Sequence, residues 1–195
     1  VNNTIVIIGY GFQYTQLIAR RIRELNVHSI ILPYDFNSKE IGKYNVSGFI
    51  LSGGPSSVYE ESAPYLPSKV FEYNVPVFGI CYGFQLLIEY FEGLVVGSNK
   101  AEYGNANIKK NQSSILLKGI SNKTTVWMSH GDKVVNLPEN WIITSKSDNN
   151  IISSAECAKL NYFGVQFHPE VIHTIEGEKI IDNFLFKVCN IVPNW

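Results

Sequence analysis

A cysteine framed by two glycines is the position in this chain best suited to chemistry. Residues 79–83 read GICYG, and a nucleophile with a glycine two positions away on each side is typical of a sharp strand-to-helix turn. The apolar run 75–80 predicts the strand, and the apolar residues of 84–91 predict the helix. Amides at the start of that helix would favour the thiolate of Cys81, which is the nucleophilic form. The alternative is a small buried hydrophobic residue, which is what most free cysteines are.

A nearby base is the next requirement, because a free thiol with a pKa of about 8.5 is only slightly ionised at neutral pH. Of the four histidines, His168 has the most informative context, since it follows an apolar strand pattern and precedes Pro169 and Glu170. In extended backbone, residues two apart point to the same side, so Glu170 can orient the His168 ring and stabilise its charged form. The sequence therefore predicts a triad of Cys81, His168 and Glu170. The alternative is a strand-end histidine beside a solvated carboxylate.

Two glycine clusters could be mistaken for nucleotide-binding loops. Residues 9–11 (GYG) follow the first strand, but position 14 is Tyr where a dinucleotide fingerprint has its third glycine. Residues 52–57 (SGGPSS) lack the Lys-Ser/Thr ending of a phosphate-binding loop. Neither cluster predicts a nucleotide site. Gly53 and Gly54 nevertheless follow a strand, at the sheet edge where open α/β proteins bind ligands, and their N–H groups could face an anion.

The composition limits the classes of function. A chain of 195 residues with 45% hydrophobic residues predicts one domain, 1–195, with a sizeable core. A net charge of −1 argues against electrostatic binding to nucleic acid or to a membrane surface, and no apolar run approaches the roughly 20 residues that span a bilayer. The three cysteines are far apart and lack CxxC spacing, which predicts reduced thiols in the cytoplasm and neither a disulfide nor a metal site.

Strand and helix patterns alternate in the first half of the chain. Strands are expected at 4–8, 29–32, 48–51 and 75–80, and helices at 14–25, 67–73 and 84–91. After residue 94 the pattern changes to short strands at 115–117, 124–128, 141–144, 151–156 and 163–167, followed by a helix at 178–189. The predicted fold is α/β: an open, mostly parallel sheet with helices on both faces, plus a smaller antiparallel section.

Three motifs now support a family resemblance. Residues 51–55 (LSGGP), 79–85 (GICYGFQ) and 167–170 (FHPE) resemble, in type and order, the motifs of class I (triad-type) glutamine amidotransferases, which implies their flavodoxin-like fold. Residues 102–104 (EYG), 126–134 (VWMSHGDKV) and 170–174 (EVIHT) resemble the GMP synthetase branch of that family. The chain departs from the pattern at 9–13 (GYGFQ) and at Phe84, where Met is usual. The Phe84 ring could alter the packing beneath the glutamine site.

The resemblance implies a role for each matching residue. Cys81 would attack the side-chain amide of glutamine, His168 would protonate the departing ammonia and then activate water, and Glu170 would orient His168. Backbone N–H groups of Gly54 and Tyr82 match the oxyanion hole. The positions expected to bind glutamine are Gly53, Gln85, Ser129, His130 and Gly131. Asp132 and Lys133 are expected to couple this chain to its partner.

That partner would be the ATP pyrophosphatase (synthetase) part, which would use ATP and Mg²⁺ to convert XMP and the released ammonia to GMP. No cofactor or metal is expected in this chain. The signature SGGVDS of the partner is absent, because SGG at 52–54 continues with PSS. The chain is thus expected to be a separate glutaminase subunit or an excised domain, and its start at Val1 favours the latter. Two alternatives remain: a γ-glutamyl hydrolase that needs no partner, and a non-catalytic glutamine-sensing module.

Overall fold

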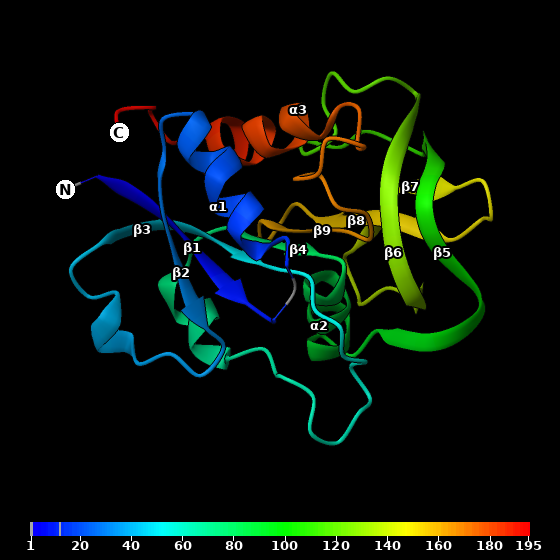
Figure 1. Ribbon diagram of the computed structural model, residues 1–195, viewed down its shortest axis with the longest axis horizontal. Coiled ribbons are helices and arrows are strands. Elements are labelled where there is room, and N and C mark those ends of the chain that lie inside the picture. The colour runs from blue at the N-terminus through cyan, green and yellow to red at the C-terminus, as the bar shows by residue number, and fades with distance from the viewer. Residues whose placement is uncertain (1, 12) are drawn as a thin grey trace.

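The computed structural model describes residues 2–11 and 13–195, which form a layered α/β structure (Figure 1). The strands are β1 (Asn3–Gly9), β2 (His28–Pro33), β3 (Asn45–Leu51), β4 (Val77–Ile80), β5 (Leu94–Lys110), β6 (Lys123–Asn136), β7 (Ile142–Ser147), β8 (Ile152–Cys157) and β9 (Tyr162–Val165). The helices are α1 (Thr15–Glu24), α2 (Tyr82–Tyr90) and α3 (Gly177–Asp182), and η3 (Asn183–Val188) continues α3 as π-helical turns. Short 3-10 segments form η1 (Ser38–Glu40) and η2 (Ser68–Tyr73).

All of these strands belong to one mixed sheet, in the order β2-β1-β3-β4-β9-β8-β7-β5-β6. The first five strands in this order pair in parallel: β2 with β1, β1 with β3, β3 with β4 and β4 with β9. The remaining pairs are antiparallel: β9 with β8, β8 with β7, β7 with β5 and β5 with β6. The predicted α/β class, with a parallel sheet and an antiparallel section, is confirmed. Because β9 lies next to β4, the C-terminal ends of these two strands bring residues near 81 and 166 together.

Helices cover both faces of the parallel part, with α1 and α3 on one face and α2 on the other (Figure 1). The sequence of strand β1 reflects this coverage of both faces. Ile5 and Ile7 pack in the core that contains α1 and α3, whereas Val6 and Ile8 pack in the core that contains α2. Successive strand residues point to opposite faces, so a strand that is covered on both sides must be apolar throughout.

Most of the expected elements occur, with shifted ends. The expected strand at 115–117 is wrong, because residues 116–119 form a turn. Leu116 and Leu117 are nevertheless buried in the core beside α3, and Asn183 donates a hydrogen bond to the Leu116 carbonyl at 2.8 Å. The apolar residues 116 and 117 therefore indicate burial and not a strand. Strand β5 was not predicted, since its side chains are mostly exposed or half-buried and the apolar alternation is missing.

Candidate active site

The predicted turn at Cys81 is present, between the end of β4 and the first residue of α2. Its backbone has φ 54° and ψ −108°, a conformation that non-glycine residues rarely adopt and that costs about 1–3 kcal/mol. Two hydrogen bonds hold it there. The Cys81 N–H donates to the Val165 carbonyl at 2.8 Å, and the Cys81 carbonyl accepts from the Gln85 N–H at 3.1 Å. The sheet and the helix together maintain this strain.

The two framing glycines are required by close backbone contacts. A Cβ at Gly79 would lie 2.6 Å from the carbonyl carbon of Gly83, and a Cβ at Gly83 would lie 2.2 Å from the Leu51 carbonyl oxygen. Neither neighbour can move without displacing a strand or the helix. The glycines thus let α2 start directly against β3 and β4, as the motif predicted.

Phe84 contacts a third glycine. A Cβ at Gly164 in β9 would lie 2.0 Å from the Phe84 ring. The ring is fully buried in the core on the α2 face of the sheet. The large side chain that departs from the family pattern is therefore accommodated by the missing side chain at position 164.

His168 and Glu170 form the expected pair. Nδ1 of His168 donates to Oε1 of Glu170 at 2.7 Å, and both side chains are buried. Burial alone would lower the pKa of His168. The charge of Glu170, followed by the hydrogen bond and charge of Cys81, outweighs burial and raises this pKa above its usual value. The three predicted triad residues therefore lie at one edge of the sheet, since Cys81 directly follows β4 and His168 comes three residues after the adjacent strand β9.

The strand β6 holds this pair in place. The His168 N–H donates to the Trp127 carbonyl at 3.0 Å, and the Thr174 hydroxyl donates to the His168 carbonyl at 2.6 Å. The same hydroxyl accepts from the Trp127 N–H at 2.9 Å. Tyr14, just before α1, packs edge-on against the His168 ring at 5.3 Å between centroids. Trp127 and Thr174 thus hold the His168 backbone, and Tyr14 packs against its ring.

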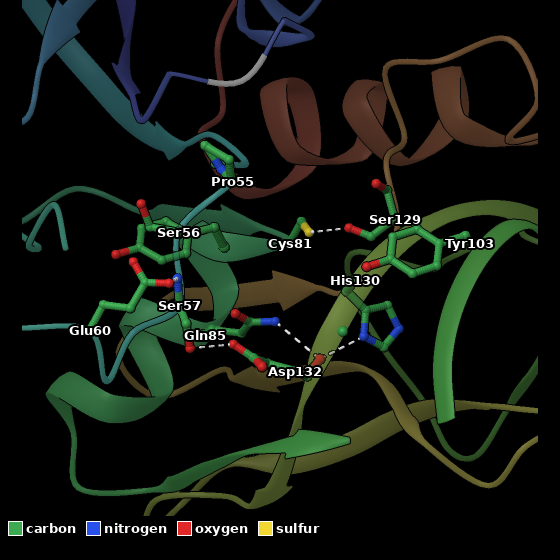
Figure 2. A pocket seen from close by; sticks show the side chains of 13 residues that line it. Pro55, Ser56, Ser57, Glu60, Cys81, Gln85, Tyr103, Ser129, His130 and Asp132 are labelled. Atoms are coloured by element: carbon green, nitrogen blue, oxygen red, sulfur yellow. Dashed lines mark hydrogen bonds between the residues drawn. The ribbon is translucent and has the colours of Figure 1, made fainter. Parts of the chain in front are cut away.

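A cavity of about 340 Å³ opens beside Cys81 (Figure 2). Its walls are the loop after β3, the start of α2 and the middle of β6. Of the predicted site positions, seven line it besides Cys81: Gly54, Tyr82, Gln85, Ser129, His130, Gly131 and Asp132. Gly53 does not line the cavity; it is buried, and its carbonyl accepts from the Ser52 hydroxyl at 3.1 Å. Lys133 is half-buried on β6, outside the lining, where it pairs with Val96.

The two residues expected to form the oxyanion hole line the same cavity as Cys81. Tyr82 is the first residue of α2, and the first N–H groups of a helix have no partner within it. Gly54 lies across the cavity, where a Cβ would come within 2.7 Å of the Tyr10 carbonyl oxygen. Only glycine allows the backbone to approach so closely at that position. The arrangement suits two backbone donors facing a developing negative charge.

Asp132 connects the opposite walls of the cavity. Its carbonyl accepts from Nδ1 of His130 at 2.6 Å and from Nε2 of Gln85 at 3.3 Å. Its carboxylate accepts from the Ser57 hydroxyl at 2.6 Å and the Tyr59 hydroxyl at 2.7 Å, both in the loop after β3. The carboxylate therefore ties this loop to β6 across the cavity mouth.

Sequence reasoning assigned no role to Glu102, which is buried behind the cavity wall. Its Oε1 bonds to Nε2 of His130 at 2.8 Å, and its Oε2 accepts from the Asn149 amide at 3.1 Å. Burial would raise the pKa of Glu102, but hydrogen bonds from His130, Ser147 and Asn149 outweigh burial and lower it. The EYG motif at 102–104 is the sequence signal that marks this residue.

Other residues at the site were also missed. Ser57, Glu60 and Tyr103 line the cavity, and Gln166 lies against the Cys81 sulfur. Within the described residues, His, Cys, Asp and Glu side chains form no group of three or more placed to hold a metal ion. In the same part of the chain, no helix is both long and apolar enough to cross a membrane.

Comparisons with known proteins agree with this geometry. The family model described as glutamine amidotransferase class-I matches residues 6–188. The glutamine-hydrolyzing GMP synthase of Thermosipho africanus is 44% identical over 193 residues, and the protein of that name from Helicobacter pylori is 46% identical over 192. These matches cover 99% and 98% of this chain but 37% of each relative. A solved structure from Thermoplasma acidophilum, whose description names a GMP synthase subunit, superposes with a TM-score of 0.81 at 28% identity, over 97% of this chain and 95% of that one.

A strained cysteine after a parallel strand, with a buried histidine–glutamate pair beside it, defines the class, and the chain belongs to the class I glutamine amidotransferase family. Within that family, its similarity is to the glutamine-hydrolyzing GMP synthases, of whose length it spans about a third (37%).

Proposed function

We propose that this chain hydrolyses glutamine to glutamate and ammonia through a γ-glutamyl thioester on Cys81. The observation that carries the proposal is the strained Cys81 at the cavity wall, at the same sheet edge as the buried, hydrogen-bonded pair of His168 and Glu170. A structural cysteine needs neither a strained backbone nor a buried histidine–carboxylate pair beside it. Cys81, His168 and Glu170 combine the nucleophile, the base and the orienting carboxylate of covalent acyl transfer.

In the first half-reaction, His168 takes the Cys81 proton and the sulfur attacks the amide carbon of glutamine. The negative charge that forms on oxygen faces the N–H groups of Gly54 and Tyr82, and one such donor is typically worth about 3–4 kcal/mol. The imidazolium then protonates the amide nitrogen, the C–N bond breaks, and ammonia leaves. In the second half-reaction, His168 deprotonates water, which attacks the thioester, and breaking the C–S bond returns the thiol and glutamate.

The other cavity residues suit the amino-acid end of glutamine. The proposed binding groups are Gln85, Ser129, His130 and Gly131. Glu60 and Asp132 add acceptor oxygens to the same cavity, and acceptors favour a substrate ammonium group. Gly53 is part of the proposed site because it directly precedes Gly54, which lines the cavity.

The ammonia would be consumed by an ATP pyrophosphatase part that converts XMP to GMP, with ATP and Mg²⁺ used there and no cofactor in this chain. Support comes from the relatives named GMP synthase, which are longer than this chain. Asp132 and Lys133 are the proposed coupling residues. The free thiols of Cys81, Cys157 and Cys189 suit the proposed cytoplasmic location.

The test is glutamate release from glutamine, measured with Cys81→Ala. We expect activity to fall by roughly four orders of magnitude or more, since the removal of an acting nucleophile typically has that effect. In a complex with the synthetase part, amination from free ammonia should be retained. Cys189→Ser is the matched control: burial raises the pKa of this thiol, so it should stay protonated, and its loss should leave hydrolysis nearly unchanged.

Residual hydrolysis above about one per cent in Cys81→Ala would overturn the assignment of the nucleophile. If the wild-type chain hydrolyses glutamine equally fast with and without a loaded partner, a hydrolase without a partner is favoured. If it binds glutamine but never hydrolyses it, the sensing module is favoured.

A further inference from the structure

A buried amide faces the nucleophile. Gln166 directly follows β9, is fully buried, and its backbone N–H donates to the Ser153 carbonyl at 2.8 Å. Its side-chain Nε2 lies 3.6 Å from Sγ of Cys81. Because β9 and β4 are adjacent parallel strands, the residue after β9 and the residue after β4 meet at the same edge of the sheet. The proposed reaction assigns no role to this amide.

The hydrogen-bond network determines which end of the Gln166 amide faces the sulfur. Nε2 of Gln85 donates to the Asp132 carbonyl at 3.3 Å and to Oε1 of Gln166 at 3.2 Å. A backbone carbonyl can only accept, so Gln85 must direct its NH₂ group to this side. A flipped Gln166 would then place NH₂ against NH₂. Oε1 of Gln166 therefore faces Gln85, and its N–H faces Cys81.

Two neighbours of the sulfur favour opposite protonation states. The Ser129 carbonyl oxygen lies 3.5 Å from Sγ and can only accept, so it favours the thiol. An N–H donor favours the thiolate, because hydrogen bonds to the charged form stabilise it. A fully buried donor is most effective, since water does not compete with it.

We propose that Gln166 is a further catalytic residue, which donates its side-chain N–H to the Cys81 sulfur and stabilises the thiolate before attack. Gln85 is then a positioning residue that orients the Gln166 amide. The inference deepens the proposed function and rests on Cys81 being the nucleophile. It also connects the cavity wall to the reacting atom, since Gln85 lines the cavity and Gln166 does not.

The experiment measures alkylation of Cys81 by iodoacetamide between pH 5 and 10, with the modified cysteine located by mass spectrometry. In Gln166→Met, which keeps the length of the side chain and removes the donor, we expect the rate at pH 7 to fall about tenfold. The midpoint of the pH–rate profile should rise by about one unit, which is the same factor of ten. In Gln166→Glu, a carboxylate beside the sulfur should raise the midpoint further.

Gln112→Glu is the matched control, because Gln112 is exposed and its amide donates to the Ile143 carbonyl at 2.9 Å. It should leave the profile unchanged. If Gln166→Met fails to fold, as judged by circular dichroism, Gln85→Leu combined with Gln166→Met removes both amides and leaves none unpaired. Wild-type alkylation in the folded single or double variant would overturn the proposal. The measurement uses no glutamine, so its failure is distinct from a failure of the proposed hydrolysis.

Discussion

Glu170 has an unusual environment at the scale of single residues. Oε1 bonds to His168, whereas Oε2 is buried and has no hydrogen-bond partner among the described residues. Arg21 approaches the residue, but its Nε donates to the Glu170 backbone carbonyl at 3.0 Å and not to the carboxylate. The charge of Glu170 therefore acts chiefly on His168. The N–H donor proposed at Gln166 acts at the opposite end of the triad, where it stabilises the Cys81 thiolate.

Glu170→Gln should lower glutamine turnover by roughly 10- to 1000-fold, less than His168→Asn, through which both proton transfers pass. The pKa of His168 is raised by Glu170. The variant imidazole should thus lose its proton at a lower pH, and the alkaline decline of turnover should shift to lower pH. Turnover of the three proteins across pH 6–10 tests this. A wild-type rate and profile in Glu170→Gln would reduce the triad to a dyad of Cys81 and His168.

At the scale of elements, the β5–β6 hairpin supplies one wall of the cavity. His130 lies on β6 and Glu102 on β5, directly opposite each other in the ladder. Nδ1 of His130 donates to the Asp132 carbonyl and Nε2 contacts the Glu102 carboxylate. The Asp132 carbonyl and the Glu102 carboxylate both accept hydrogen bonds. Each of the two contacts of the His130 ring must therefore contain a proton. His130 of this pair lies between Ser129 and Gly131 on β6, where the pairing with β5 shifts register between Gly97 and Glu102.

Glu102→Gln tests the pair through stability. Hydrogen bonds lower the pKa of Glu102 below its usual 4.5 despite burial. A lowered folded-state pKa contributes stability above the unfolded value, and this contribution is lost as pH falls through the folded value. Wild-type stability should therefore decline below about pH 4.5, and more steeply than that of the variant. At pH 7 the variant should be less stable by roughly 1–3 kcal/mol, measured by urea unfolding.

Asp148→Asn is the control for this prediction, because Asp148 is an exposed carboxylate in the turn after β7 whose ion pair with Lys123 is 3.9 Å long. Exposed pairs of this kind contribute little, so the variant should match the wild type. Parallel acid declines for wild type and Glu102→Gln would show that Glu102 is not held as a carboxylate.

At the scale of the whole molecule, the chain spans 37% of the length of the relatives named GMP synthase. The cavity mouth is closed in part by the Asp132 contacts to Ser57 and Tyr59. Lys133 directly follows Asp132 on β6 and does not line the cavity. A partner that contacts this part of β6 could thus alter the cavity wall without touching glutamine.

Hydrolysis by this chain alone should be slow, and addition of the synthetase part with ATP and XMP should accelerate it roughly 5- to 150-fold, the range of a coupling of about 1–3 kcal/mol. Lys133→Ala should reduce the stimulated rate more than the unstimulated one. Asp132→Ala should reduce both rates, since its carboxylate reaches the cavity. Equal stimulation of wild type and Lys133→Ala would remove Lys133 from the coupling path.

The chain alone determined those features that depend on local geometry. Cys81 could be predicted because its turn needs glycines two residues away on each side, and His168 with Glu170 because extended residues two apart share a side. The parallel half could be predicted because strands covered on both faces contain unbroken apolar runs, as residues 5–8 of β1 do.

Only the tertiary structure decided the rest, because long-range partners have no local pattern. Glu102 meets His130 across 28 positions and Gln166 meets Cys81 across 85. Strand β5 is mostly polar and is formed by pairing, whereas the apolar residues 116 and 117 are buried in a turn. Backbone pairing can order a polar segment and a core can bury a turn, so burial and secondary structure are separate consequences of the fold.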